Sequence, residues 1–505
     1  MKKGAILILL VHYCALLVSQ NLTLTRQFDT YRKNVPLQII NNDAGYFYML
    51  RYNKLAHDMT VERRSKSSGQ VLAFAPLKLD SVNASWFDYE HLDYLFFEHN
   101  HICYFVFEKM LNTSKSIFMK AIDTMGHSNG FVELGSLDLD KMAEGFNFSV
   151  TRNGGRLLVV SALHYTNKSS KKVALLYDVE ERRNIWVKKL PLENAHTGYS
   201  RCYTADAQNN LYYLITKEYV SGYKRKVINQ QQVMVPVFAC DSVIIATLLH
   251  DDPLPHRTPL AIGKLNSLKS IYIDTEKEPV VVAHYTQNNT QGQNQPFLLA
   301  QGFSPDLSRS LFSEIAPLSA SLVEKLTFYD GDDLKEPAGK DYALSGISRN
   351  NGYLYYMAGR SEPNYFKELL LWKINLRNGR VLDQQLLPRK IFYFDDRTRF
   401  KNLGLTAQQS VDDNLYTFVI EHPNNLSQGP QDFKFRRFSK QKYLSKANLV
   451  AYILRPNGVF EKKLVYRNKL MEAVPLQYSS NQRDAVFYLN NAKTEQFAIL
   501  KLGEF

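Results

Sequence analysis

Three aspartates are the side chains of this sequence that come closest to a catalytic constellation. Asp330 and Asp332 belong to the run DGDD, and Asp395 begins the run DDR. Two carboxyl groups at a defined separation can cleave a glycosidic bond, one as the acid and the other as base or nucleophile. The DGDD run lacks the alternating oxygen ligands and the closing Glu of an EF-hand loop, so a solvated loop explains it better than a calcium site.

The recognised catalytic motifs are absent from the sequence. It contains no H-E-x-x-H zinc pattern, no G-x-S-x-G elbow, no P-loop and no dinucleotide fingerprint. We therefore predict no catalytic residue, no cofactor and no metal ligand. The sequence therefore favours a noncatalytic protein, and an enzyme whose catalytic site is assembled from distant loops is the alternative.

One segment combines basic and aromatic side chains in a way that could bind a partner. Such a segment can contact an acidic polymer, although an exposed loop or an edge strand blunted with charge has the same composition. The net charge of +13 is moderate for 505 residues, and we predict no nucleic-acid partner. The candidate binding residues are Phe433, Lys434, Phe435, Arg436, Arg437 and Tyr443.

The first twenty residues have the pattern of a secretory signal peptide. Lys2 and Lys3 precede the apolar run Ala5–Val18, and Ser19 is a small residue close to a plausible cleavage point. We expect an exported protein that does not span the membrane, in the periplasm or at the cell surface. Three cysteines follow this segment, with no C-x-x-C spacing, so buried free thiols are favoured over a Cys202–Cys240 disulfide.

The elements that would position these residues follow one repeated pattern. An Asn, Asp or Gly turn directly precedes a run of Leu, Val and Tyr in TRNGGRLLVV, AQNNLYYLI, RNNGYLYYM and VDDNLYTFVI, which begin at Thr151, Ala207, Arg349 and Val411. Such turns allow positive φ, and such runs suit a buried strand. Recurrence along most of the chain predicts an all-β protein, a β-propeller of four-stranded blades.

The spacing of the turns predicts about seven blades, with six or eight as alternatives. We expect residues 21–505 to form a single propeller domain after a signal peptide at 1–20. Outer hairpins are expected at Val173–Leu190, Leu369–Asp383 and Leu449–Tyr466. Helical spacing at Ala320–Leu326 predicts a short helical insertion within Ser308–Lys335.

The order of these segments resembles exported β-propeller-like (WD40-like) proteins of Bacteroidota bacteria. The resemblance lies in Phe146–Ala162, Val173–Leu192, Tyr203–Tyr219 and Lys446–Asn468, and it covers most of the chain after the signal segment. Asn153 stands where the pattern usually has Asp, which is still a turn former. The resemblance implies a noncatalytic envelope protein and supplies no catalytic residues.

Three functional interpretations follow. The first is a noncatalytic binding or scaffolding module of the bacterial cell envelope, whose partner is an envelope protein or a glycan. The second is a propeller glycosidase or lyase acting on an extracellular polysaccharide through Asp330, Asp332 or Asp395 near the axis. The third is a secreted eukaryotic glycoprotein, in which Asn-x-Ser/Thr sequons such as those at Asn83 and Asn147 would carry glycans.

Overall fold

The structure is a computed structural model of the 505-residue chain. It describes residues 22–29, 34–41, 45–53, 55–56, 58–79, 94–111, 114–138, 143–151, 155–163, 172–190, 197–228, 231–252, 254–263, 265, 267–288, 294–323, 342–362, 365–387, 391–392, 407–421, 448–467, 472–474, 483–491 and 493–503. The predicted signal peptide lies outside these residues and stays a prediction, as does the assignment of residues 21–505 to one domain.

The described residues form eight antiparallel sheets, each built on four strands. We call them blades I to VIII, with strands A to D from the innermost to the outermost. In order A to D, blade I consists of β3 (Asn34–Asn41), β4 (Tyr46–Asn53), β5 (Asp58–Ser65) and β6 (Val71–Pro76), and blade II of β7 (Tyr94–His99), β8 (Ile102–Leu111), β9 (Ser114–Ile122) and β10 (Val132–Asp138). Blade III consists of β11 (Ala143–Val150), β12 (Arg156–Leu163), β13 (Lys172–Asp178) and β14 (Arg183–Leu190). Blade IV consists of β15 (Thr197–Ala205), β16 (Leu211–Ile228), β17 (Gln231–Leu248) and β18 (Pro255–Pro259).

The second half of the chain completes the ring. Blade V consists of β19 (Ser267–Asp274), β20 (Val280–Asn288), β21 (Asn294–Phe303) and β22 (Ser310–Pro317). Blade VI consists of β23 (Tyr342–Asn350), β24 (Tyr353–Glu362), β25 (Tyr365–Asn375) and β26 (Val381–Leu387). Blade VII consists of β28 (Ala407–Val411), β29 (Asn414–Glu421), β30 (Asn448–Leu454) and β31 (Phe460–Arg467). Blade VIII has β32 (Glu472–Val474), β33 (Asp484–Asn490), β34 (Thr494–Lys501) and, from the other end of the chain, β1 (Leu22–Leu24). Short β2 (Phe28–Asp29) also pairs with β34, and β27 (Ile391–Phe392) with β25.

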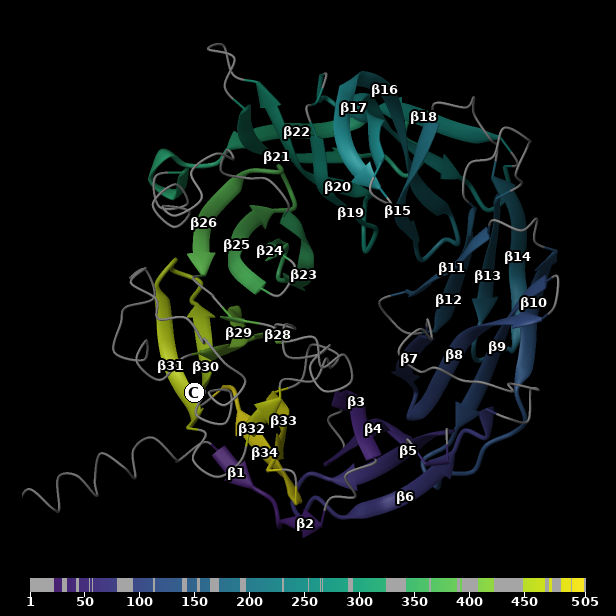
Figure 1. Ribbon diagram of the computed structural model, residues 1–505, viewed down its shortest axis with the longest axis vertical. Helices are drawn as coiled ribbons and strands as arrows, with labels where there is room; N and C mark the ends of the chain where they lie inside the picture. Colours follow the sequence, from purple (N-terminus) through teal and green to yellow (C-terminus); the bar gives the residue numbers. More distant parts are fainter. Residues whose placement is uncertain are drawn as a thin grey trace, which may run out of the picture.

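The blades are arranged radially around a central axis, with the A strands innermost (Figure 1). The predicted all-β propeller and its three outer hairpins, β13–β14, β25–β26 and β30–β31, are confirmed. The predicted count of about seven blades is wrong, and the alternative of eight is right, because the described strands make eight four-stranded sheets. The count was hardest to read around blade V, whose A–B turn at residues 275–279 has none of the Asn, Asp or Gly residues that mark the turns of other blades.

Positive φ angles explain why Asn, Asp and Gly residues mark the A–B turns of other blades. Among the A–B turns that the structure describes, those of blades I, II, IV, VI and VII hold residues in the left-handed region, which Asn, Asp and Gly adopt at low cost. Asn209 has φ 69°, Asn351 φ 44° and Asp413 φ 64°, whereas none of residues 275–279 has a positive φ. In the C–D turns, Gly379 at φ 73° and Gly458 at φ 82° occupy the two Asn-Gly hairpins.

The hydrophobic core consists of layers between neighbouring blades rather than one central cluster. Each cluster of buried residues among the described strands draws on two adjacent blades, or on blades VII, VIII and I together. The largest fully buried side chains are mostly tyrosines, with Trp372 and Phe47. The many Tyr and Phe residues therefore fill the layers between blades, as the sequence indicated.

The ring closes by pairing the two ends of the described chain. β1 lies antiparallel to β34, with Leu22 opposite Leu500 and Leu24 opposite Ala498. The purple N-terminal strands and the yellow C-terminal ones accordingly lie side by side in Figure 1. The Thr25 hydroxyl then accepts a hydrogen bond from the Phe497 amide at 3.0 Å. Strand pairing thus fastens blade VIII with a segment that precedes blade I.

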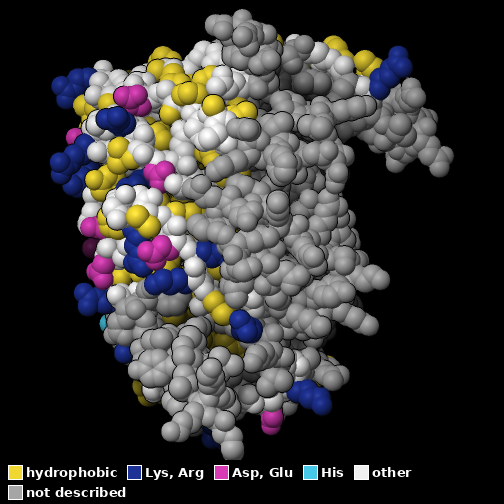
Figure 2. Space-filling model, turned by 90° about the vertical axis from the view of Figure 1, so that its left-hand side faces the viewer, with side chains coloured by type: hydrophobic (Ala, Val, Ile, Leu, Met, Phe, Trp, Pro, Cys, Tyr) yellow, Lys and Arg dark blue, Asp and Glu magenta, His cyan; other side chains and the backbone are white. Residues whose placement is uncertain are grey.

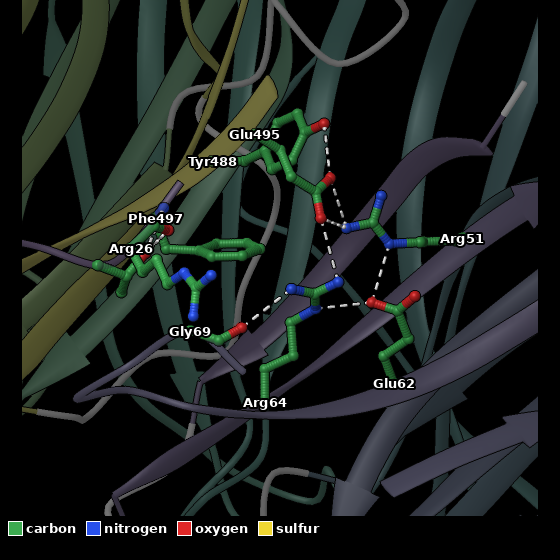
Figure 3. A network of polar contacts seen from close by, with 9 residues as sticks. Arg26, Arg51, Glu62, Arg64, Gly69, Tyr488, Glu495 and Phe497 are labelled. Carbon is green, nitrogen blue, oxygen red and sulfur yellow. Dashed lines mark hydrogen bonds and ion pairs between the residues drawn. The ribbon is translucent and has the colours of Figure 1, made fainter. Parts of the chain in front are cut away.

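A buried charge network joins blade VIII to blade I at this closure (Figure 3). Both Arg51 on β4 and Arg64 on β5 donate to Glu62 of β5, at 2.9 and 2.7 Å, and to Glu495 of β34, at 2.8 and 3.1 Å. The side chains of Arg51 and Glu495 are 3% and 4% exposed. Burial opposes the charge on Glu62, but Arg51 and Arg64 outweigh it and lower the pKa of this carboxyl.

Further polar contacts extend the same interface. The Tyr488 hydroxyl donates to Glu495 at 3.2 Å, and the Arg64 guanidinium donates to the Gly69 carbonyl at 2.9 Å. Lys66 pairs with Asp484 at 2.8 Å. The closure therefore combines strand pairing, aromatic packing and a dense set of charge-assisted hydrogen bonds.

The predicted helical insertion is confirmed in part. Residues 310–317 within Ser308–Lys335 form the outer strand β22 of blade V, and the helical portion that the structure describes is one turn at residues 320–323. Leu322 in this turn packs into the layer between blades V and VI. The rest of the insertion, residues 324–335, lies outside the described residues.

The described residues also answer two sequence questions. Cys103, Cys202 and Cys240 take part in no disulfide, as the sequence favoured. In the part of the chain that the structure covers, no helix has the length and apolar character to cross a membrane. Figure 2 shows one side of the ring, where basic, acidic and hydrophobic side chains are interspersed.

The closure network predicts a large effect of removing Glu495. Glu495→Ala leaves two buried guanidinium groups with half of their carboxylate partners, so the free energy of unfolding should fall by roughly 3–5 kcal/mol. Urea unfolding followed by tryptophan fluorescence measures this loss. The matched control is Glu461→Ala, because Glu461 pairs with Arg455 at 3.0 Å in a partly exposed position. Its loss should stay below about 1 kcal/mol, and equal losses for the two variants would contradict this assignment.

A buried histidine predicts acid sensitivity of the interface between blades V and VI. His284 on β20 is fully buried against Trp372, with ring centroids 5.2 Å apart. Burial, reinforced by Lys269, lowers the pKa of His284 to about 3. Below pH 6.5 the unfolded chain takes up a proton at this position that the folded protein does not, so stability falls as the pH drops from 6.5 toward 3.

The measurement is urea unfolding of the wild type and of His284→Phe between pH 7 and pH 4. The variant retains a ring beside Trp372 but cannot titrate there. We expect a shallower loss of stability with falling pH in the variant, whatever its stability at pH 7. Identical slopes would show that His284 is not responsible.

Candidate functional site

Two adjoining hollows open at the end of the ring that carries the A–B turns. The first, about 400 Å³ in volume, is lined by residues of blades III to VI, and the second, about 610 Å³, by residues of blades V to VIII. Glu276 and Arg349 line both. We call the two hollows together the turn groove, because most of its lining lies in or beside A–B turns. Its volume is in the range that accommodates a small ligand.

An ion-pair cluster between blades V and VI forms the middle of the turn groove. The Arg349 guanidinium, at the end of β23, donates to the Asp274 carboxylate at the end of β19. It also pairs with Glu276 at 3.2 Å. The side chains of Arg349 and Asp274 are 10% and 6% exposed, whereas that of Glu276 is 41% exposed. The cluster ties two neighbouring blades together at the turn end of the ring.

Asp206 in blade IV organises its turn. Its carboxylate accepts hydrogen bonds from the amides of Gln208 and Asn210, at 2.9 and 2.8 Å, and from the Tyr212 hydroxyl at 3.0 Å. Burial, and then the charge of Asp206, raise the pKa of Tyr212. Because its oxygens are engaged by these donors, Asp206 is suited to shaping the groove rather than to proton transfer.

Arg156 connects blade III to blade IV across the groove. Its guanidinium donates to the Ala207 carbonyl at 2.8 Å and to the Asp206 carbonyl at 3.4 Å. A guanidinium has five N–H donors, so this side chain can hold a turn and still face a ligand.

Two buried serine residues are among those that line the groove. Ser348 on β23 is 3% exposed and Ser410 on β28 is 6% exposed. Each lies just before the A–B turn of its blade, and one lines each hollow. Within the described part of the chain, neither hydroxyl oxygen has a hydrogen-bond partner. Buried hydroxyls without a described partner also occur away from the groove, at Ser116 and Thr247, so this property alone does not mark a binding site.

The predicted site residues are not among these. Phe433, Lys434, Phe435, Arg436, Arg437 and Tyr443 lie outside the described residues, so the aromatic-basic segment stays a prediction. The same holds for Asp330, Asp332 and Asp395. Among the residues that the structure describes, no group of three His, Cys, Asp or Glu side chains is placed to hold a metal ion.

The groove residues could have been suspected from their position in the repeat. Ser348, Arg349, Ser410 and Asp206 flank the Asn and Asp turns that revealed the blades. The sequence shows that each turn exists, but only the closed ring shows that the turns of successive blades meet at one end.

Neither a protein-family model nor a curated protein matches the chain. Among solved structures, the chain is similar to the Nup133 β-propeller domain of Vanderwaltozyma polyspora, with 8% identity, a TM-score of 0.35, and coverage of 81% of this chain and 99% of that one. It is also similar to oligopeptidase B of Leishmania major, with 10% identity, a TM-score of 0.38, and coverage of 90% and 53%.

A third similar structure is an α-L-arabinofuranosidase of Fusarium graminearum, solved with an iminosugar inhibitor. It has 9% identity, a TM-score of 0.31, and coverage of 68% of this chain and 94% of that one. At such low identity and superposition, these similarities bear on neither the substrate nor the activity of this chain.

The ion-pair cluster predicts coupling between its members. Arg349→Met leaves Asp274 buried without its guanidinium partner, so we expect a loss of roughly 3–5 kcal/mol in the free energy of unfolding. In Arg349→Met/Asp274→Asn the buried charge is gone as well, and the double variant should be more stable than the sum of the single losses by about 1–3 kcal/mol. Urea unfolding of the four proteins provides this comparison. Additive losses would contradict a direct Arg349–Asp274 interaction.

Proposed function

We propose that this chain is a noncatalytic binding or scaffolding module of a bacterial envelope, and that its ligand occupies the turn groove. The observation that carries the proposal is a preformed hollow spanning six blades, III to VIII, whose walls are fixed by bonds between blades. Arg156 and Arg349 make such bonds on either side of the first hollow. Preorganised walls favour binding, because little order must be gained when the ligand arrives.

The chemistry of the groove supports binding over catalysis. General acid–base catalysis needs a carboxyl group that can reach the substrate and exchange a proton. The carboxylates of Asp206 and Asp274 are instead committed to turn amides and to Arg349, and Glu276 pairs with Arg349 as well. The alternative, a glycosidase or lyase, rests on Asp330, Asp332 and Asp395, which lie outside the described residues.

Export to the envelope is part of the proposal and rests on Met1–Gln20 alone. The aromatic-basic segment Phe433–Tyr443 remains a candidate second contact for an envelope protein or glycan. Its composition supports that role, while the turn groove supplies the ligand site in this proposal.

A blocked groove tests the proposal. Ala207 is an exposed groove residue in the A–B turn of blade IV, so Ala207→Trp should fill the first hollow without disturbing the core. Mixed with isolated envelopes of the native cells, the purified wild type should sediment with them. Ala207→Trp should reduce the apparent affinity by about tenfold or more.

Leu254→Trp is the matched control, because Leu254 is 70% exposed in the C–D turn of the same blade and does not line the groove. This variant should sediment like the wild type. If Ala207→Trp also sediments like the wild type, the groove is not the binding site. Activity on a polysaccharide panel that Ala207→Trp abolishes would replace the noncatalytic proposal with the glycosidase alternative.

A further inference from the structure

We infer that the long hairpin of blade IV binds the surface of a bilayer that contains anionic lipids. This inference goes beyond the proposed function, because it concerns a surface that does not line the turn groove. β16 and β17 are 18 residues long each, whereas the next longest described strand, β25, has 11. We call the part of the hairpin that extends beyond the blade, Tyr219–Ile228 with Gln231–Ala239, the arm.

The arm is a two-stranded ribbon without a third strand. β15 pairs with β16 only as far as Lys217, and β18 pairs with β17 only from Ile244 onward. Among the described strands, none pairs with the arm beyond these points. An isolated two-stranded hairpin has little stability in water, and both of its outer edges stay open. The arm therefore gains stability when a further surface covers it.

Apolar side chains of the arm are exposed to solvent. Tyr223 is 64% exposed, Met234 56% and Val220 42%. Arg225 is also exposed, and it lies directly opposite Met234 in the register of the two strands. Directly opposite residues share a face of a ribbon, as do residues two apart on one strand. Tyr223, Arg225 and Met234 therefore form one accessible face that combines an aromatic ring, a guanidinium and a thioether.

The sequence of the arm is basic and contains no acidic residue. Lys224, Arg225 and Lys226 are consecutive, and no Asp or Glu occurs within Tyr219–Ala239. An anionic membrane surface attracts lysine and arginine that come within a Debye length of it. Tyrosine favours the headgroup region of a bilayer, where its apolar ring and its polar hydroxyl both find suitable surroundings. The charge and the aromatic character of the arm thus match the same partner.

A second copy of the chain is a poorer partner for the arm. Pairing two arms would bring two runs of three cations together, and like charges on neighbouring strands destabilise their pairing. Lysine on an exposed strand also discourages edge-to-edge association. The hydrocarbon interior of a bilayer does not suit the arm either, because the open edges of the ribbon would leave backbone N–H and C=O groups unsatisfied there. We place the arm among the lipid headgroups.

The direction of the arm gives the bound ring a defined orientation. β16 starts at Leu211, directly after the A–B turn of blade IV that borders the turn groove, and its first residues cross the blade beside β15. The arm therefore leaves the ring at the end opposite to the turn groove. A ring that is held to a bilayer by the arm presents the groove away from the lipid, where a ligand can reach it.

Sedimentation of the purified protein with lipid vesicles tests the inference. We expect the wild type to bind phosphatidylcholine vesicles that contain about one third phosphatidylglycerol, but not pure phosphatidylcholine vesicles. Binding should weaken at high salt, because salt screens the attraction. Arg225→Glu should lower the apparent affinity by about tenfold or more. Tyr223→Thr, which keeps a strand-forming residue but removes the ring, should lower it by about fivefold.

Two variants of blade III are the matched controls. Val187 and Lys189 are exposed on its outermost strand, β14, with Val187 at 57%. Lys189→Glu changes the net charge as much as Arg225→Glu does, and Val187→Thr removes an exposed apolar side chain from a strand. Both controls should bind vesicles like the wild type. All four substitutions are at exposed positions, so each melting temperature should stay close to that of the wild type.

A fluorescent reporter shows whether the arm itself contacts the lipid. Tyr223→Trp places an indole at an exposed position of the arm. Anionic vesicles should shift its emission to the blue, and lipids brominated close to the headgroup should quench it more than lipids brominated at the chain end, because indole favours the interface. The wild type, measured in the same way, provides the background of the native tryptophans. An unchanged difference spectrum would place the lipid contact elsewhere and overturn the inference.

Three vesicle results would also overturn it: equal binding to neutral and anionic vesicles, binding to neither, or binding that Arg225→Glu and Tyr223→Thr leave unchanged. Self-association of the wild type that both arm variants abolish, without vesicle binding, would assign the arm to a second copy instead. Binding of oligogalacturonate without vesicle binding would assign it to an acidic polymer.

The groove is tested separately from the arm. Ala207→Trp should bind vesicles like the wild type, because Ala207 lines the turn groove at the other end of the ring. Envelopes would be bound through both surfaces, and two linked contacts strengthen each other. The groove is therefore also tested by adding Ala207→Trp to Arg225→Glu. A further loss of envelope binding in that double variant would support the proposed function even if no vesicle binds the wild type.

Discussion

Ring closure is the constraint on which the rest of this structure depends. A propeller buries the faces of its blades only if the last blade packs against the first, because an open ring would expose two apolar faces. This chain meets the requirement in two ways. β1 completes blade VIII by pairing with β34, and Arg51, Glu62, Arg64 and Glu495 form a buried network between blades VIII and I. The strand pairing holds the backbone, and the directional ion pairs fix how the two blades are oriented.

Closure also accounts for the position of the turn groove. Each blade contributes only a short A–B turn and the end of an inner strand, which is too little to form a site. When the ring is complete, described residues from blades III to VIII line the two adjoining hollows. Contacts between blades, from Arg156 to the Ala207 carbonyl and from Arg349 to Asp274, then hold the turns in register. A site of this kind belongs to the assembled ring.

The sequence could predict what is local and repeated. Asn209, Asn351 and Asp413 mark turns because their positive φ angles restrict the residue types allowed there. The turn of blade V carries no such mark, because residues 275–279 need no positive φ, and the count of blades was therefore too low. The closing strand β1 is only three residues long, and its partner lies at the opposite end of the chain. Arg349 and Asp274 are ordinary strand residues in the sequence, and only the closed ring brings them together as a buried ion pair.

The pairing of Leu22 with Leu500 has a consequence for the order of events during synthesis. A strand that emerges from the ribosome near the beginning must wait for one that emerges near the end. Contacts of such long sequence separation slow folding, because the loop between them must be ordered before they form. Until β34 arrives, the apolar edge of β1 and the charged faces of β4 and β5 have no native partner. During this interval the nascent chain exposes surfaces that the finished ring covers, and such exposed surfaces favour aggregation.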